Sequence, residues 1–142
     1  MKKVEIVFFT EITFAGGMGY AGSPTTDLSQ VGSTPDSDGS RKFLIFKDNT
    51  DLSICIGPPL RIVSYSHEHL ANVSYEDRPE WAMPRRTDEM DLAGGGDCVL
   101  DLQGKTITFS GASTDFGAYD KILLTEHAEK IEDVLGMKPI FR

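Results

Sequence analysis

Two apolar runs decide the fold: Lys42-Phe43-Leu44-Ile45-Phe46-Lys47 and Leu52-Ser53-Ile54-Cys55-Ile56. Asp48-Asn49-Thr50-Asp51 separates them, and polar clusters of this length commonly form turns between strands. The stretch therefore predicts two neighbouring strands joined by a turn. Gly57-Pro58-Pro59 follows the second run and is expected to end that strand.

Further strands are predicted on both sides of this pair. Lys3 to Phe14 is rich in Val, Ile, Phe and Thr, which favour strands. Leu60 to Tyr65 alternates apolar and polar residues well enough for another strand. Cys98 to Leu102 and Lys105 to Phe109 flank a Gln-Gly pair and indicate a β-hairpin. Lys138 to Phe141 is expected to form a closing edge segment.

Two helices complete the prediction. His67 to Arg78 is compatible with a helix that Ser66 caps and that stops before a proline. Leu124 to Leu135 repeats apolar residues at spacings of three and four, and Gly136 suits its end. The order strands, helix, strands, helix predicts an α+β fold. We expect a five- to six-stranded mixed, mostly antiparallel sheet with two main helices packed on it.

Three stretches are predicted to lack regular structure. Ala15 to Ser40 is a long loop rich in Gly, Ser and Pro, a composition that disfavours helices and strands. Pro79 to Asp91 is a polar connection. It leads to Gly94-Gly95-Gly96, which has neither helix nor strand character and is expected to lie in a loop.

The composition indicates one globular domain over residues 1–142, long enough to bury a core without disulfides or metals. Acidic residues outnumber basic ones 22 to 14, and a net charge of −8 repels polyanions, so no nucleic-acid partner is expected. No apolar run approaches the roughly 20 residues of a membrane span, so no membrane partner is expected either. The start resembles a strand rather than a signal peptide. We expect a cytoplasmic monomer.

The cysteines and histidines predict no metal site. Cys55 and Cys98 lie in apolar segments, where a free thiol usually packs as a small hydrophobic group, and both are expected to be reduced. His67-x-His69 is the one local histidine pair. Without paired metal-ligand spacing, no structural metal and no cofactor are expected.

Three short stretches carry groups suited to chemistry. Gly94-Gly95-Gly96 lets the backbone approach a ligand, although triple glycines also form ordinary turns. Ser110 to Gly117 offers hydroxyl and N–H groups that can hold an anion, although connecting loops have the same composition. Ser66-His67-Glu68-His69 places an imidazole at a strand-to-helix junction, where most histidines are simply solvated or hydrogen-bonded. No single stretch identifies a function.

The order and spacing of these stretches resemble the protein histidine phosphatase (Janus/Ocnus) family. Pro35-Asp36-Ser37-Asp38-Gly39, followed by the Lys42 strand, is similar to the family's Asp-Ser-Asp-Gly turn and basic strand start. Gly94-Gly95-Gly96 and Phe109 to Gly117 resemble its Gly-Gly-Gly-Arg-Ile and Tyr-Gly-Tyr-Ser-x-Ala-Tyr-Gly segments. Leu124-Thr125-Glu126 resembles its Ser-Thr-Glu helix start. The resemblance covers about Asp36 to Phe141, and the segment before it is longer than expected for the family.

The resemblance implies a metal-independent phosphatase acting on phosphohistidine or phospholysine, in a phosphorylated protein or a small phosphoramidate. His67 matches the family's reactive histidine, as general base or phosphoryl acceptor, and His69 is the fallback if the register differs. Lys42 matches the basic residue that holds phosphoryl oxygens, and Ser113 matches the serine of the anion loop. The remaining residues expected to line the substrate site are Gly95, Gly96, Asp97, Thr114 and Asp115.

Two positions depart from the family pattern and leave other functions open. Asp97 stands where the family has an arginine, and Asp115 where it has a small residue. Carboxylates beside a phosphate are repulsive, so the alternative is a catalytically inactive relative that binds a ligand or a protein in the same cleft. A third possibility is a metal site of His67, His69 and one of these carboxylates, because a cation would neutralise the repulsion.

Overall fold

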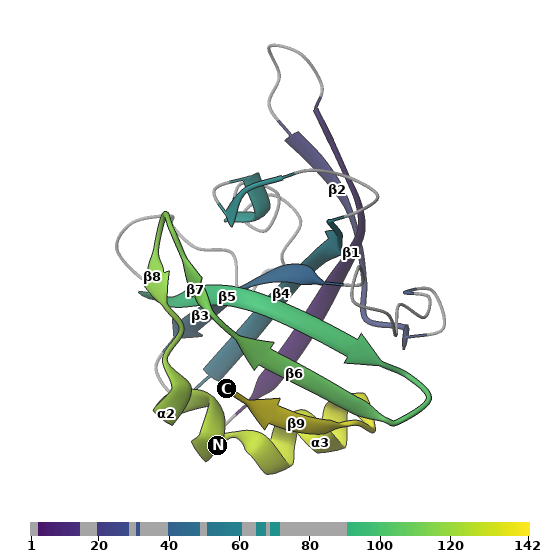
Figure 1. The fold of residues 1–142 in the computed structure, drawn as a ribbon, viewed down its shortest axis with the longest axis vertical. Helices are drawn as coiled ribbons and strands as arrows, with labels where there is room; N and C mark the ends of the chain where they lie inside the picture. Colours follow the sequence, from purple (N-terminus) through teal and green to yellow (C-terminus); the bar gives the residue numbers. More distant parts are fainter. Residues whose placement is uncertain are drawn as a thin grey trace.

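The computed structural model describes residues 3–14, 20–28, 31, 40–48, 51–60, 65–67, 69–71 and 91–142, which form an α+β fold with a mixed sheet (Figure 1). His67 and residues 69–71 are helical. The strands are β1 (Val4–Phe14), β2 (Tyr20–Thr25), β3 (Arg41–Asp48), β4 (Asp51–Pro59), β5 (Asp91–Asp101), β6 (Thr106–Ser110), β7 (Ala112–Ser113), β8 (Gly117–Ala118) and β9 (Lys138–Phe141), and the named helices are α2 (Lys121–Glu126) and α3 (Ala128–Leu135).

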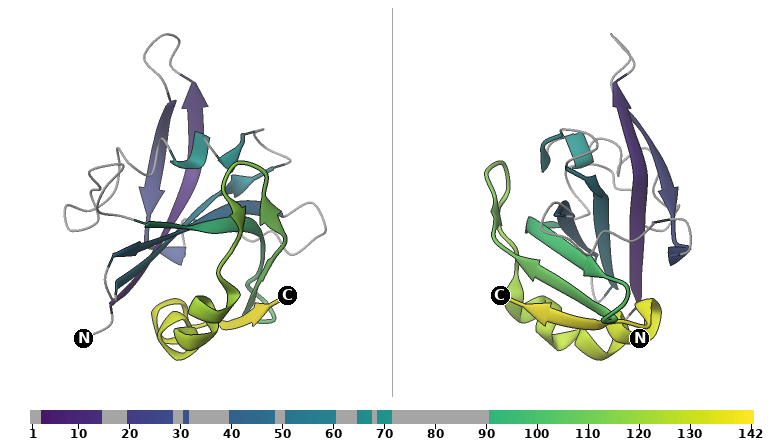
Figure 2. Two further views of the ribbon diagram at one scale, coloured as in Figure 1. Left: turned by 90° about the vertical axis from the view of Figure 1, so that its left-hand side faces the viewer. Right: turned by 45° about the vertical axis from the view of Figure 1, so that its right-hand side comes forward.

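The described sheet has nine strands, more than the five or six expected. Its main path runs β2-β1-β4-β3-β5-β6-β9, while β7 and β8 form a small hairpin attached to β5. The β1–β4, β5–β8 and β6–β9 pairs are parallel, and the other pairs are antiparallel. The predicted strand pairs β3–β4 and β5–β6 are both present. The sheet is strongly twisted, so that β5 and β6 run at a steep angle to β1 and β4 (Figure 1, Figure 2).

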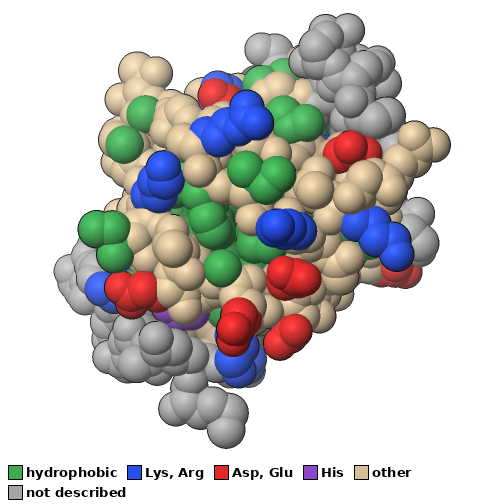
Figure 3. Space-filling view, turned by 60° about the horizontal axis from the view of Figure 1, so that its bottom comes forward, with side chains coloured by type: hydrophobic (Ala, Val, Ile, Leu, Met, Phe, Trp, Pro, Cys, Tyr) green, Lys and Arg blue, Asp and Glu red, His purple; other side chains and the backbone are tan. Residues whose placement is uncertain are grey.

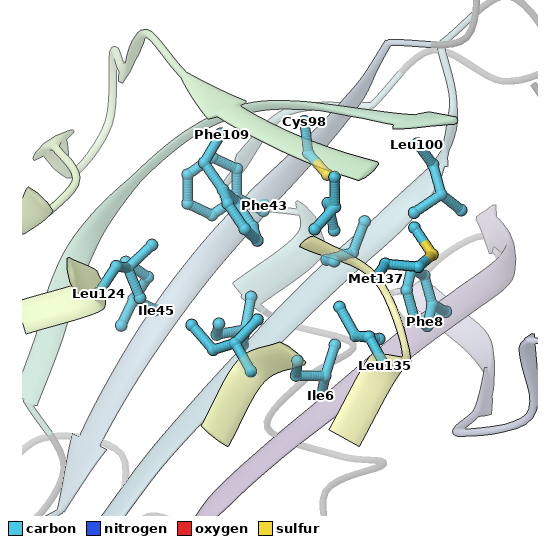
Figure 4. Packing of buried hydrophobic residues seen from close by; sticks show 14 of the residues in the cluster. Ile6, Phe8, Phe43, Ile45, Cys98, Leu100, Phe109, Leu124, Leu135 and Met137 are labelled. Atoms are coloured by element: carbon cyan, nitrogen blue, oxygen red, sulfur yellow. The ribbon is translucent and has the colours of Figure 1, made fainter. Parts of the chain in front are cut away.

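Alternation along β3 divides the core between the two faces of the sheet. Phe43 and Ile45 pack with the cluster beneath α2 and α3, where Phe43 meets Phe109 edge-on at a centroid distance of 4.9 Å. Leu44 and Phe46 pack with the opposite cluster, which contains the buried Leu70 of the helical segment. Figure 4 shows the first cluster from close by. The helices therefore cover opposite faces of one sheet.

The helix predicted over Leu124 to Leu135 is two helices, because His127 interrupts it. The His127 Nδ1–H donates to the carbonyl of Leu123 at 2.8 Å, and its backbone N–H turns to Leu124 instead. Helix α2 also begins earlier than predicted, since the Asp120 carboxylate caps it by accepting the N–H of Leu123. Gly136 ends α3 in the left-handed conformation, as predicted.

Two predictions about irregular segments are corrected. Tyr20–Thr25 lies within the predicted 15–40 loop but forms β2, because β4 pairs with one edge of β1 and leaves the other edge open for β2. Strand β4 runs through Gly57-Pro58-Pro59 instead of ending before it.

The predicted strand from Leu60 to Tyr65 is not seen at its two described ends, since Leu60 is in a turn and Tyr65 is outside any strand. Several predictions lie outside the described residues: the Asp36–Gly39 turn, Arg61 to Ser64, the helix beyond Ala71, and the polar connection up to Met90.

The face that carries α2 and α3 presents both hydrophobic and charged side chains (Figure 3). Hydrophobic side chains reach the surface there between acidic and basic ones, and Ile122 and Val134 are 73% and 50% exposed. In the part of the chain that the structure describes, no helix has the length and apolar character needed to cross a membrane.

Candidate functional site

The triple glycine lies inside strand β5, which corrects its assignment to a loop. A Cβ atom on Gly94 would collide with the backbone of Ala118, and one on Gly96 would collide with the carbonyl of Ser110. A Cβ on Gly95 would lie 2.5 Å from the carbonyl oxygen of Phe43. Three neighbouring strands thus approach β5 closely, and only glycine leaves them room. Composition alone predicts a loop, because it carries no information on this crowding.

Ser66 positions the candidate histidine at the beginning of a helical turn. Its hydroxyl accepts the N–H of His69 at 3.2 Å, and its own N–H donates to Nδ1 of His69 at 3.2 Å. This reciprocal pair is a capping box with histidine in place of the usual Glu or Gln, and it confirms the predicted cap. His67 is the first residue after the cap, and it is 4% exposed.

The His67 ring packs against the glycines of β5. Its Nε2 lies 2.9 Å from the carbonyl oxygen of Gly96. Because a carbonyl only accepts, the neutral ring carries its proton on Nε2, and Nδ1 holds the free lone pair. Its Cδ2 lies 3.1 Å from the place of a Cβ on Gly95, so any side chain at position 95 would displace the ring. Among the described residues, Nε2 makes the one hydrogen bond of the ring.

Charges around His67 tune its protonation. Burial lowers the pKa of His67 below its usual value, the hydrogen bond to Gly96 opposes that shift, and the Lys42 ammonium lowers the pKa further. The carboxylates of Asp97 and Asp115 raise it without reversing the net effect. The imidazole is therefore neutral at neutral pH, which is the form that can accept a proton or attack phosphorus.

Strand register places further candidate residues on the His67 side of the sheet. Lys42 is the direct cross-strand neighbour of Asp97, which is in turn the neighbour of Ser110. All three lie on the same face as Leu44, which packs in the core cluster beneath the helical segment. The Asp97 carboxylate leans toward Gly111, since its Oδ2 lies 3.0 Å from where a Cβ of that glycine would be.

Ser113, Thr114 and Asp115 lie on the β7–β8 hairpin. Ala118 of β8 pairs with Gly95, which holds the hairpin against the strand that His67 contacts. The Ser113 side chain is buried, and its Oγ accepts the N–H groups of Asp115 and Phe116 at 3.2 and 3.1 Å. These amides, expected to hold an anion, are thus already engaged. Thr114 is exposed.

Tyr65 is a structural part of the site that the sequence analysis missed. Its side chain is buried, and its hydroxyl donates to the carbonyl of Pro58 at 2.6 Å and accepts the N–H of Lys42 at 3.0 Å. Tyr65 lies two positions before His67, so these hydrogen bonds connect the start of the His67 turn to Lys42, which lies at a bulge in the β3–β4 pair. Burial raises the pKa of Tyr65, so the hydroxyl stays neutral. A tyrosine at the end of an apolar run gives no signal of this role.

Arg41, the neighbour of Lys42, is a second structural residue that the sequence analysis missed. Arg41 is 1% exposed, and its guanidinium donates to the carbonyls of Gly57 and Val31 at 3.1 and 3.4 Å. Its contacts are to backbone oxygens, which fits a structural role. Lys42 is half-buried and remains the basic residue beside the histidine.

His69 is committed to the helix cap, since its Nδ1 accepts the N–H of Ser66. It lies two residues from His67 in a helical segment, a spacing that directs the two side chains away from each other. Within the described residues, no group of three or more His, Cys, Asp or Glu side chains is placed to hold a metal ion.

Comparison with known proteins assigns no family to the chain: it matches no protein-family model, and a search of curated proteins finds no significant relative.

Proposed function

We propose that this chain is a metal-independent phosphatase of phosphohistidine- and phospholysine-type phosphoramidates, in proteins or small molecules. The observation that carries the proposal is the His67 imidazole: buried, neutral, and held through Nε2 by the Gly96 carbonyl. Nδ1 is then the reactive nitrogen, either as a general base toward water or as a phosphoryl acceptor. The resemblance to protein histidine phosphatases supports the same assignment.

Lys42 and the Ser113 loop supply the phosphate contacts in this proposal. Lys42 shares a face of the sheet with Asp97, and its charge acts on His67. Its ammonium would offset charge on the transferring phosphoryl oxygens, and phosphoryl transfer depends mostly on such positioning and charge complementarity. The N–H groups of Asp115 and Phe116 would exchange their bonds to Ser113 Oγ for bonds to phosphate oxygens.

The test is phosphate release from phosphohistidine in EDTA, followed by ³¹P NMR. His67→Gln is the sharpest variant, because the glutamine amide can replace Nε2 as donor to Gly96 while removing the basic nitrogen. The expected loss of rate is about a hundredfold or more. His67→Ala should lose at least as much, and Lys42→Met should lose rate while the exposed Lys47→Met does not.

Other outcomes assign the function differently. Loss of rate in His69→Gln with full rate in His67→Gln would transfer the reactive role to His69. Loss of activity in EDTA, restored by a divalent cation, would favour the metal site instead.

A catalytically inactive relative is the second candidate function, favoured by Asp97 and Asp115. At an effective dielectric constant near 20, two unit charges about 4 Å apart interact by about 4 kcal/mol, so either carboxylate can offset the attraction of Lys42 for phosphate. Asp97→Arg tests this, with inorganic phosphate titrated into both proteins. If the wild type is inactive and the variant gains phosphate affinity, the cleft is intact and only its charge has changed. No gain would mean that residue 97 does not face the bound anion.

A further inference from the structure

Lys42 and Asp97 carry opposite charges side by side, yet they form no ion pair. They are cross-strand partners in the antiparallel β3–β5 pair, so their Cβ atoms lie about 5 Å apart on one face of the sheet. Both side chains are half-buried. Among the described residues, no hydrogen bond or ion pair holds the Lys42 ammonium or the Asp97 carboxylate. Asp115, in contrast, already has an interaction partner within the chain.

The direction of the Asp97 side chain accounts for the missing ion pair. Strand β5 lies between β3, which carries Lys42, and β6. The Asp97 carboxylate leans away from β3 toward Gly111, where its Oδ2 lies 3.0 Å from the position that a Cβ would occupy. A side chain at position 111 would crowd this carboxylate, and glycine leaves it room. The cation and the anion therefore stand apart, and the charges of both act on His67.

Cleavage of a P–N bond requires a positive charge on the leaving group. Without an additional proton, an amine or imidazole would have to leave as a nitrogen anion, which is a very poor leaving group. In the reactive form of phospholysine the cation is the nitrogen bonded to phosphorus, and in phosphohistidine it is the same imidazole ring. Such a substrate presents an anion and a cation side by side, whereas a phosphate ester presents only the anion.

We infer that Asp97 contacts the protonated leaving group of the substrate while Lys42 holds its phosphoryl oxygens, and that this contact makes the site selective for P–N over P–O bonds. The inference rests on the proposed phosphatase function. A carboxylate accepts charge-assisted hydrogen bonds from cationic N–H groups, and these are roughly twice as strong as neutral ones. An arginine at position 97 would repel the same leaving group.

The step balances with water as the only co-reactant. A water oxygen forms a bond to phosphorus and gives a proton to His67 Nδ1, while the P–N bond breaks. The electron pair of that bond stays on the leaving nitrogen, and the leaving group departs as a neutral amine or imidazole because it already carries its proton. His67 then returns its proton to the released base, and inorganic phosphate is the second product. Asp97 favours the protonated substrate, which is the form that reacts.

The test compares kcat/KM for phosphohistidine and for p-nitrophenyl phosphate, whose leaving group departs without a proton, in EDTA. Asp97→Asn keeps the shape of the side chain and removes its charge, and it should lower the phosphohistidine-to-nitrophenyl ratio about tenfold or more. Asp97→Glu restores the carboxylate and should recover most of the ratio. Asp133→Asn removes a charge from the exposed face of α3 and should leave the ratio unchanged. A merely structural role of Asp97 would lower both rates together.

Calorimetric titration in the His67→Gln background separates this inference from the phosphatase proposal. The two probes are inorganic phosphoramidate, whose zwitterion carries an ammonium on phosphorus, and inorganic phosphate. Adding Asp97→Asn should weaken phosphoramidate binding about tenfold and leave phosphate binding equal or tighter. That result, with a wild type that hydrolyses neither substrate, would refute the phosphatase and keep the leaving-group contact. Hydrolysis of phosphohistidine with a ratio unaffected by Asp97→Asn would refute the contact and keep the phosphatase.

Discussion

Removing the hydroxyl of Tyr65 tests how the site is built, because one buried group links strand β3, the end of β4 and the entry to the His67 turn. In Tyr65→Phe the carbonyl of Pro58 loses a donor at 2.6 Å, and the N–H of Lys42 loses an acceptor at 3.0 Å. The residue is 5% exposed, so water has little access to replace either partner. Each unpartnered buried group costs about 1–3 kcal/mol, so the expected loss in the free energy of unfolding for the two groups is about 2–6 kcal/mol.

Tyr119→Phe is the matched control, since it deletes the same hydroxyl from a buried side chain on the other face of the sheet. The Tyr119 hydroxyl lies 3.2 Å from the carbonyl of Phe109 and 2.8 Å from that of Arg142. The Phe109 carbonyl also accepts the N–H of Arg142 and so keeps a partner. The expected loss is about 1 kcal/mol.

Urea unfolding, followed by circular dichroism, measures the free energy of unfolding of both variants. The dependence of that free energy on urea concentration should be equal in the two proteins. Tyr65→Phe should also weaken phosphate binding, because Lys42 and the His67 turn lose a shared anchor, whereas Tyr119→Phe should not. If the two variants differ in stability by less than about 0.5 kcal/mol, the linking role of Tyr65 is wrong.

Three further predictions concern His67, the glycine of β5 that its ring packs against, and the β7–β8 hairpin. Because the pKa of His67 is lowered in the folded state, stability is retained above the unfolded-state value near 6.5 and lost as the pH falls through the folded-state pKa. The difference in unfolding free energy between about pH 7.5 and about pH 5.5 should therefore be smaller in His67→Gln than in the wild type, and an equal difference would contradict the assignment. Gly95→Ala should cost about 1–3 kcal/mol and shift the NMR signals of the His67 ring. Gly117→Ala, where a Cβ meets nothing within 4 Å, should cost only its backbone strain at φ 86°, about 1–2 kcal/mol, and leave those signals in place. Ser113→Ala should speed hydrogen exchange at the amides of residues 115 and 116, which lose their acceptor, and unchanged exchange would mean that the hydroxyl does not hold the turn.

The predictions that were confirmed rest on local patterns. The apolar runs around Asp48-Asn49-Thr50-Asp51 pair as β3 and β4, since a turn between two such runs brings them together directly. Ser66 caps a helical turn and Gly136 ends α3, because both signals depend only on the nearest few residues. The α+β class and the mixed sheet followed from the order of these elements.

The predictions that were wrong concern segments whose structure is set by distant partners. Tyr20–Thr25 becomes a strand because the open edge of β1 offers backbone hydrogen bonds, which a segment can use without a strand pattern in its side chains. The His127 side chain divides the last helix by competing for the carbonyl of Leu123, a contact that hydrophobic periodicity does not contain.

The sequence by itself determined which residues are candidates for the chemistry: one histidine after a helix cap, a lysine at the head of a strand, three glycines and two unexpected aspartates. Only the tertiary structure decided that the imidazole meets the carbonyl of Gly96, 29 residues away, and that Lys42 lies beside Asp97. The reason is that strand register is set by backbone hydrogen bonds and by close packing at glycine, where three strands crowd β5. Those constraints act between segments far apart in the chain, so no local pattern of side chains contains them.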